Sequence, residues 1–139
     1  MNEIHLPAAL YEEMARHVAA HLPEEACGLV GGLVHGPVAR AVVFYPIENI
    51  LHSAVAYEMD PLPQIRAMID IEAAGLELVA IYHSHPSGPA RPSSTDVEQA
   101  YYPDSAYLII SLADRQRPTV RGFMLSDGET REIDVGLVS

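Results

Sequence analysis

Two histidines and an aspartate stand close together in the stretch IYHSHPSGPARPSSTD, which runs from Ile81 to Asp96. The apolar run LVAIY leads into His83 and indicates a buried strand, in which residues i and i+2 point to the same face. His83 and His85 should therefore project together. Two imidazoles and one carboxylate suit a divalent metal, zinc first, and three protein ligands leave a fourth position for water. The stretch predicts a catalytic metal site with His83, His85 and Asp96 as ligands.

The spacing His-x-His, seven residues, then Ser-x-x-Asp resembles the signature of the JAMM metalloproteases, also called MPN-plus domains. That family also carries a glutamate well upstream, and here Glu25 begins the sequence EACG. Two further features match the family outline, Asn49 in a loop and Asp60-Pro61 before a helix. The resemblance covers nearly the whole chain and predicts a single JAMM domain of residues 1–139.

The resemblance implies a function and a role for each residue. One zinc ion per chain would be held by His83, His85 and Asp96. Glu25 would act as the general base toward the water and then as the acid toward the leaving amine, and Ser93 would hold the oxyanion. The implied substrate is a peptide or isopeptide bond after the C-terminal glycines of a ubiquitin-like or sulfur-carrier protein. The released group and the oligomeric state are left open.

Other interpretations remain open at this point. The histidines on one strand could be a core pair, Ser93 a helix N-cap, and Asp96 a charge that favours the positive end of its helix. The domain could be a non-catalytic MPN scaffold, a RadC-like protein or a metal-storage protein. A zinc nucleoside deaminase is excluded because its Pro-Cys-x-x-Cys needs two cysteines, and Cys27 is the only one. Cys27 itself is more typical of a small buried residue than of a nucleophile.

Composition limits the class of protein further. The chain has 139 residues, 49% of them hydrophobic, which predicts a folded globular protein. Its net charge of −11 argues against binding to nucleic acid, which requires a basic face. We find no apolar run long enough for a membrane helix and no basic, apolar signal peptide, so we expect a cytoplasmic location.

The periodicity predicts an α/β fold with a curved, mixed, mostly antiparallel sheet flanked by helices. This agrees with the MPN fold and its cytidine-deaminase-like layers, as the resemblance implies. Helical patterns cover 7–22, 61–74 and 93–102. In the first of them, His17 and His21 are interpreted as a solvated face. Strand patterns cover 1–6, 26–34, 38–45, 54–57, 76–85, 107–112, 119–125 and 129–135.

Overall fold

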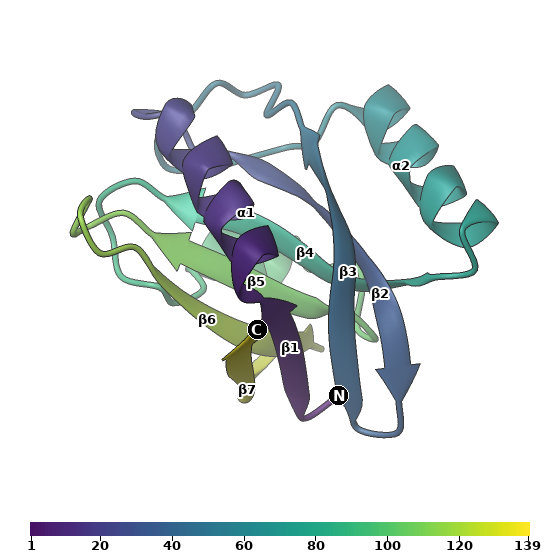
Figure 1. Cartoon of the computed structure of the whole chain (residues 1–139). Coiled ribbons are helices and arrows are strands. Elements are labelled where there is room, and N and C mark those ends of the chain that lie inside the picture. Colours follow the sequence, from purple (N-terminus) through teal and green to yellow (C-terminus); the bar gives the residue numbers. More distant parts are fainter.

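Seven strands form one mixed sheet that closes into a barrel in the order β1-β3-β2-β4-β5-β6-β7 (Figure 1). The computed structural model describes residues 1–139. The β1–β3, β1–β7 and β4–β5 pairs are parallel and the other four are antiparallel. The predicted curved, mixed sheet is therefore confirmed. The strands are β1 (Glu3–Pro7), β2 (Cys27–His35), β3 (Val38–Ile47), β4 (Glu77–His85), β5 (Ala106–Ser111), β6 (Thr119–Ser126) and β7 (Glu129–Val138).

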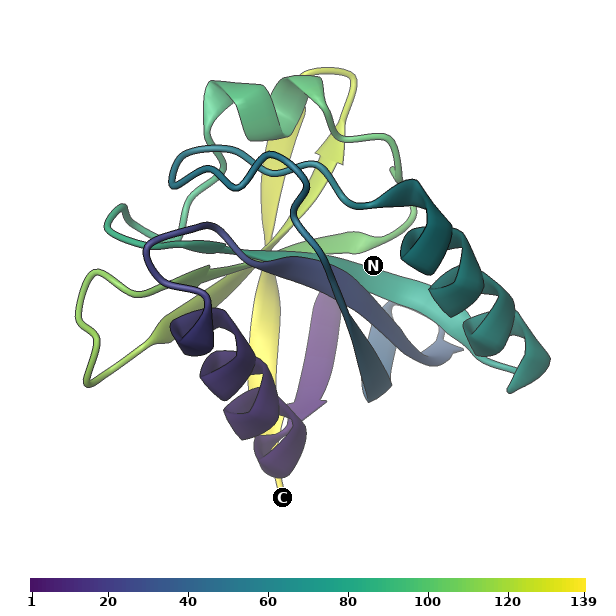
Figure 2. The same cartoon turned by 90° about the horizontal axis from the view of Figure 1, so that it is seen from above.

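Three helices cover the sheet: α1 (Ala8–Ala20), α2 (Pro61–Ala73) and α3 (Ser94–Glu98). The buried apolar residues form two hydrophobic clusters, one packed against α1 and the other against α2. Met14 and Val18 of α1 pack into one cluster, and Ala67 and Ile71 of α2 pack into the other. Figure 2 shows α1 and the green α3 on opposite sides of the sheet. Because successive residues of a strand alternate between faces, each central strand contributes to both clusters.

The helix boundaries follow local signals. Asp60 is the N-cap of α2 and its carboxylate accepts a hydrogen bond from the Leu62 amide, with Pro61 at the first helical position, as predicted. The helix ends at Ala73, and Gly75 follows the C-cap residue Ala74 with a φ of +74°, which favours glycine. No helix of the structure has both the length and the apolar character needed to cross a membrane.

One predicted strand is absent, and one predicted helix is shorter than expected. Residues 54–57 do not form a strand, and the segment holds only an isolated bridge between Asn49 and Met59. The Asn49 side chain donates to the carbonyl of Ala56, inside the predicted strand, and accepts from the amides of Leu51 and Glu58 on either side of it. The third helix ends at Glu98 instead of continuing to residue 102.

A local contact keeps residue 102 out of the helix. The amide of Tyr102 donates to the hydroxyl of Tyr107 on β5 and so makes no helical bond. The segment after α3 is tied to the sheet by this contact, which no periodicity in the sequence reveals.

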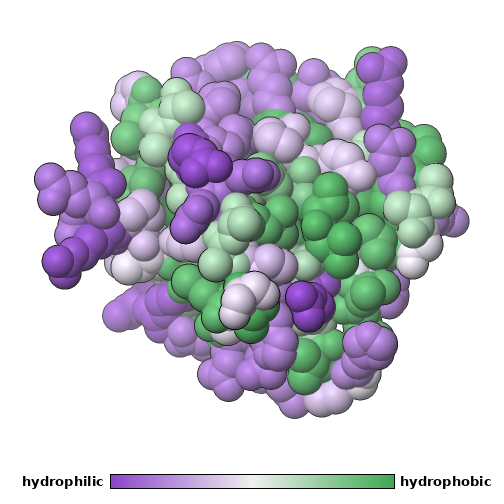
Figure 3. All heavy atoms as spheres, viewed as in Figure 1, coloured by the Kyte–Doolittle hydropathy of each residue, from purple (hydrophilic) through white to green (hydrophobic).

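Apolar side chains also gather on part of the surface. Figure 3 shows them on the face seen in Figure 1, toward the side of α2. On α2 itself, Leu62, Ile65 and Ile69 are exposed at 54% or more. The helix buries only Ala67 and Ile71.

Candidate metal centre and catalytic site

The pairing of β2 with β4 positions the upstream glutamate beside the two histidines. Cys27 lies opposite His83 in this antiparallel ladder, and the amide of Ser84 donates to the carbonyl of Ala26. Glu25 lies two residues before β2, and continuing the same register beyond the end of the strand brings it opposite His85. Directly opposed residues of an antiparallel pair point to the same face. Glu25, His83 and His85 therefore share one face of the sheet, although 58 residues separate the paired segments in sequence.

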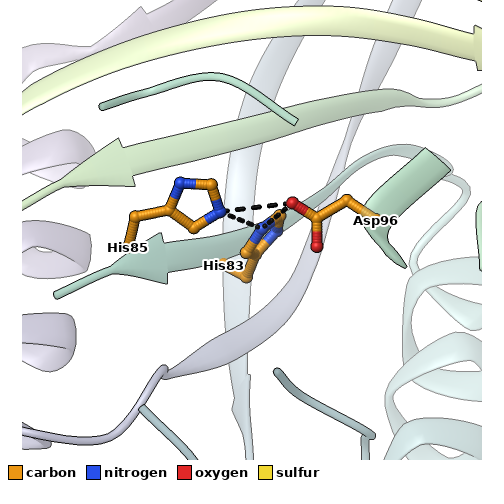
Figure 4. Close-up of side chains that lie close together, drawn as sticks. All are labelled: His83, His85 and Asp96. Atoms are coloured by element: carbon orange, nitrogen blue, oxygen red, sulfur yellow. Dashed lines mark hydrogen bonds and ion pairs between the residues drawn. The ribbon is translucent and has the colours of Figure 1, made fainter. Parts of the chain in front are cut away.

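Three side-chain atoms meet at one point on that face. Nε2 of His83 lies 3.1 Å from Nε2 of His85 and 3.1 Å from Oδ2 of Asp96, and Nε2 of His85 lies 3.2 Å from the same oxygen. Figure 4 shows the two imidazoles reaching from β4 and the carboxylate reaching from the start of α3. The sequence prediction that these three side chains converge agrees with this geometry, and one ligand atom from each lies within 4.8 Å of the others.

The donor set fits a cation. Nδ1 of His85 lies 2.8 Å from the carbonyl oxygen of Pro89, which can only accept, so Nδ1 of His85 carries the hydrogen. In the neutral imidazole, Nε2 then presents a lone pair to the Asp96 carboxylate, which is also an acceptor. A bound divalent ion would turn this contact between two acceptors into two favourable bonds. A histidine that ligates a metal usually donates its other ring N–H to a carboxylate, a backbone carbonyl or water, which fixes its tautomer. The contact of His85 with Pro89 is of this kind.

At each of the three ligands, burial and the contacts with neighbouring groups shift the pKa in opposite directions. Burial lowers the pKa of His83, more than its contact with Asp96 raises it. Burial also acts to lower the pKa of His85, but the protonated imidazole can donate to Asp96 as well as to Pro89, and these hydrogen bonds outweigh burial and raise this pKa. At Asp96, burial is outweighed by hydrogen bonds to both histidines, which hold the pKa of the carboxyl well below its usual range. The carboxylate is therefore ionised, as a metal ligand must be.

Ser93 and Asp96 form a capping box at the start of α3. The Ser93 hydroxyl accepts from the Asp96 amide at 3.0 Å, and the Asp96 carboxylate accepts from the Ser93 amide at 2.8 Å. The capping alternative is therefore correct for Ser93. It does not exclude a second role, because the hydroxyl oxygen accepts here and its own hydrogen stays available as a donor.

Glu25 is buried at 4% exposure, and its Oε1 has no hydrogen-bond partner. Burial raises its pKa from 4.5 to about 7; the charge of His85 lowers this pKa and that of Asp96 raises it. A carboxyl that titrates near pH 7 can both accept and donate a proton there. Glu24, its neighbour in sequence, is half-buried and contacts His52 at 3.0 Å.

Three residues that hold this site had no role in the sequence prediction. The amide group of Asn49 donates to the backbone carbonyl of Glu25 at 2.9 Å. The hydroxyl of Ser84 accepts from the amide of Ala26 at 2.9 Å. The ring of Tyr57 stacks on His83 with centroids 4.5 Å apart. The place of Asn49 in the family outline was the only signal for any of them.

Two other residues were open to interpretation. Cys27 is fully buried, and burial raises the pKa of its thiol to about 12, so it is no nucleophile, as expected. The prediction of a solvated face is wrong for His17. Its Nδ1 lies 2.9 Å from the hydroxyl of Tyr82, and burial, with the charge of His21, lowers its pKa to about 4.

Comparisons with known proteins agree with this geometry. The family model for prokaryotic homologs of the JAB domain matches residues 7–125. The chain is 36% identical over 127 residues to a probable TtuB-protein conjugate cleaving protease of Thermus thermophilus, covering 91% of this chain and 78% of that protein. It is 34% identical over 131 residues to the CysO-cysteine peptidase of Mycobacterium tuberculosis, covering 94% and 88%. A desampylase of Haloferax volcanii is 39% identical over 90 residues, covering 64% and 63%.

The fold is also found in solved structures. The solution structure of a protein from Desulfitobacterium hafniense superposes with a TM-score of 0.90 at 38% identity, covering 98% of this chain and 93% of that one. Another, from Salinibacter ruber, has a TM-score of 0.71 at 27% identity, covering 97% and 92%. Family match, named relatives and fold lead to the same conclusion: this chain belongs to the prokaryotic JAB-domain family of JAMM-type metallopeptidases.

Proposed function

We propose that this protein is a zinc-dependent hydrolase with His83, His85 and Asp96 as zinc ligands. It would cleave a peptide or isopeptide bond after the C-terminal glycines of a ubiquitin-like or sulfur-carrier protein. The observation that carries the proposal is the meeting of three ligand atoms beside a buried carboxyl whose Oε1 has no partner. The substrate class rests on relatives named for a TtuB-protein conjugate and for CysO-cysteine.

A zinc ion held by these ligands would polarise the substrate carbonyl and acidify a water molecule. Glu25, as the general base, accepts a proton as the water oxygen bonds to the carbonyl carbon. Its carboxyl then donates a proton to the amine nitrogen as the C–N bond breaks. One water is consumed, and a carboxylic acid and an amine are released, between which the remaining water proton passes to give a carboxylate and an ammonium group. The pKa near 7 suits Glu25 for both transfers.

Ser93 is proposed as the donor to the oxyanion. Its hydroxyl oxygen is fixed by the amide of Asp96, at the first turn of the helix that carries this ligand. In this proposal the hydroxyl would donate to the reacting carbonyl oxygen from the position that the cap already fixes. A single donor of this type contributes roughly 3 kcal/mol to transition-state stabilisation in comparable sites.

A cavity of about 520 Å³ beside Asp96 is the proposed place for the glycine tail. It lies between the loop before α2 and the segment after α3, and its lining includes Tyr57, Ile81, Tyr102 and Tyr107. Aromatic side chains close to Asp96 suit a diglycine tail, because glycine has no side chain and the tail can lie flat against the rings.

The test is hydrolysis of a carrier protein that ends in Gly-Gly and carries one further residue or a lysine-linked partner. We expect the wild type to release the extension and a zinc chelator to stop the release. Glu25→Gln should keep its zinc and lose roughly 10²-fold or more in turnover, because only the proton transfers are removed. Zinc content and mass spectrometry of the carrier measure both. Binding of the carrier with no cleavage by the zinc-loaded wild type would support the scaffold interpretation instead.

A further inference from the structure

The two histidines of the site are held in different ways, although they lie on one strand. Nδ1 of His85 lies 2.8 Å from the carbonyl oxygen of Pro89, and this contact fixes both the tautomer and the plane of the ring. Nδ1 of His83 is buried and has no hydrogen-bond partner. When Nε2 of His83 ligates a cation, the hydrogen of the neutral ring sits on Nδ1. His83 therefore carries a buried donor that no group of the protein accepts.

The neighbours of His83 in the sheet explain why this donor is alone. The residue opposite it on β2 is Cys27, and the residue paired with it on β5 is Ile109. Residues in register on neighbouring strands point to the same face of a sheet. Ile109 has no polar side-chain atom, and the thiol of Cys27 donates to the carbonyl of Ile47 at 3.3 Å. The ring of His83 must therefore be oriented by contacts other than a hydrogen bond to Nδ1.

The contact that orients it is with Tyr57. The two rings stack with centroids 4.5 Å apart and planes 26° apart, whereas His85 meets His83 at its edge, with centroids 5.0 Å apart at 62°. An imidazole turns about a bond whose torsion is broad and roughly two-fold, so a ring without a wall can turn Nε2 away from Asp96. With Tyr57 lying against its face, such a turn would push the edge of His83 into the tyrosine ring.

Tyr57 does not depend on the metal for its own position. Its half-buried side chain packs against the hydrophobic cluster that α2 covers, and it lines the cavity beside Asp96. The contact with His83 is made by the ring, so a phenylalanine at this position would make it as well.

We propose that Tyr57 is the positioning residue of His83, and that its ring replaces the hydrogen bond to Nδ1 that orients other ligating histidines. It acts through His83 and takes no part in the proton transfers. The inference rests on the proposed ligand set, and it assigns part of the affinity for zinc to Tyr57. Loss of an outer partner of a ligating histidine lowers metal affinity by about 10–100-fold, and we expect an effect of this size.

The test is the zinc affinity of Tyr57→Ala, measured without substrate by competition with a chromophoric chelator. We expect the Kd for zinc to rise about tenfold or more. Tyr57→Phe keeps the ring and should bind zinc nearly as tightly as the wild type. Tyr45→Ala is the matched control, because Tyr45 is another half-buried tyrosine packed on the same cluster and does not stack on His83. This variant should keep the zinc affinity of the wild type.

Urea unfolding in the presence of chelator shows which variants are folded. If Tyr57→Ala is not folded, Tyr57→Leu replaces it, since leucine fills much of the space but has no ring face. Wild-type zinc affinity in the variant without the ring would overturn this inference alone. An equal loss of affinity in Tyr57→Phe would assign the effect to the hydroxyl, and an equal loss in Tyr45→Ala would assign it to general loosening; either result also overturns the inference. If the wild type binds no zinc, the proposed function fails and the inference with it.

Discussion

Cys27 lies directly opposite His83 in the ladder between β2 and β4. This one pair sets the position of the whole candidate site, because the strand that ends in the two histidines runs antiparallel to the strand that Glu25 precedes. A shift of one residue in this register would turn Glu25 to the other face of the sheet. Gly28, the next residue of β2, allows β2 to lie close to Tyr45 of β3 and Tyr82 of β4. A Cβ at this position would overlap the carbonyl oxygen of Tyr45 and lie 2.5 Å from the ring of Tyr82.

The first prediction concerns the metal. We expect about one zinc per purified chain. His83→Ala should lose that zinc, because a site of three protein ligands then retains only two. His35→Ala, which changes an exposed histidine at the end of β2, is the matched control and should keep it. Elemental analysis of both variants measures the difference. Equal zinc in His83→Ala and wild type would remove His83 from the ligand set.

The second prediction concerns the stability of the metal-free protein against pH. Burial raises the pKa of Glu25 from 4.5 in an exposed chain to about 7 in the folded protein. Below pH 4.5 both states hold the proton and burial of the carboxyl has no electrostatic cost. Between pH 4.5 and 7 the unfolded state ionises first, so folding loses stability as pH rises. Above pH 7 the loss is complete, at up to about 3 kcal/mol.

Glu25→Gln removes this cost because glutamine does not ionise. The variant should therefore unfold at a higher temperature than wild type at pH 8 in the presence of chelator, and at nearly the same temperature at pH 4. Calorimetry at the two pH values measures the difference. A variant that is less stable than wild type at pH 8 would show that the Glu25 carboxylate has partners that stabilise its charge.

Local patterns in the sequence were enough to place His83, His85, Ser93 and Asp96. Two of these sit at i and i+2 of one strand, and the other two are the N-cap and third residue of one helix, so short-range geometry determines them. Glu25 could be found only through the family resemblance, because its position depends on a strand register between distant segments.

Other features depend on contacts that no period in the sequence encodes. The barrel closes through the parallel pairing of β1 with β7, from the two ends of the chain. Residues 48–60 are organised by the Asn49 side chain instead of by strand ladders, which is why the strand predicted at 54–57 is absent. His17 is drawn into a half-buried contact because Tyr82 points across the sheet toward α1.

The third prediction separates the two roles of Ser93. Ser93→Gly keeps most of the capping stability, since glycine is a tolerated N-cap that costs only about a few tenths of a kcal/mol. It removes the hydroxyl, however, and should lower turnover by roughly 10²-fold or more if Ser93 donates to the oxyanion. Ser93→Thr keeps a hydroxyl and a cap and should retain more activity. Steady-state kinetics and chemical unfolding of the two variants measure both quantities. Near wild-type turnover in Ser93→Gly would leave Ser93 with the cap alone.

The fourth prediction concerns Asn49, which is buried at 6% exposure and uses both ends of its side-chain amide. Its Nδ2 donates to the carbonyls of Glu25 and Ala56, and its Oδ1 accepts from the amides of Leu51 and Glu58. Asn49→Ala leaves these backbone groups without partners, and each unsatisfied buried group costs roughly 1–3 kcal/mol. We expect the variant to lose about 2 kcal/mol or more in urea unfolding.

Asn49→Ala should also keep its zinc and lose turnover, because the backbone of Glu25 is released while the three ligands stay in place. Asn49→Asp should be no better, since it sets a carboxylate oxygen against the carbonyl of Glu25. The control is Asn2→Ala, which removes one exposed hydrogen bond to Arg131 and should change stability by no more than about 0.5 kcal/mol. If Asn49→Ala unfolds and turns over like Asn2→Ala, then Glu25 is held in position by the β2–β4 ladder and Ser53 without help from this amide.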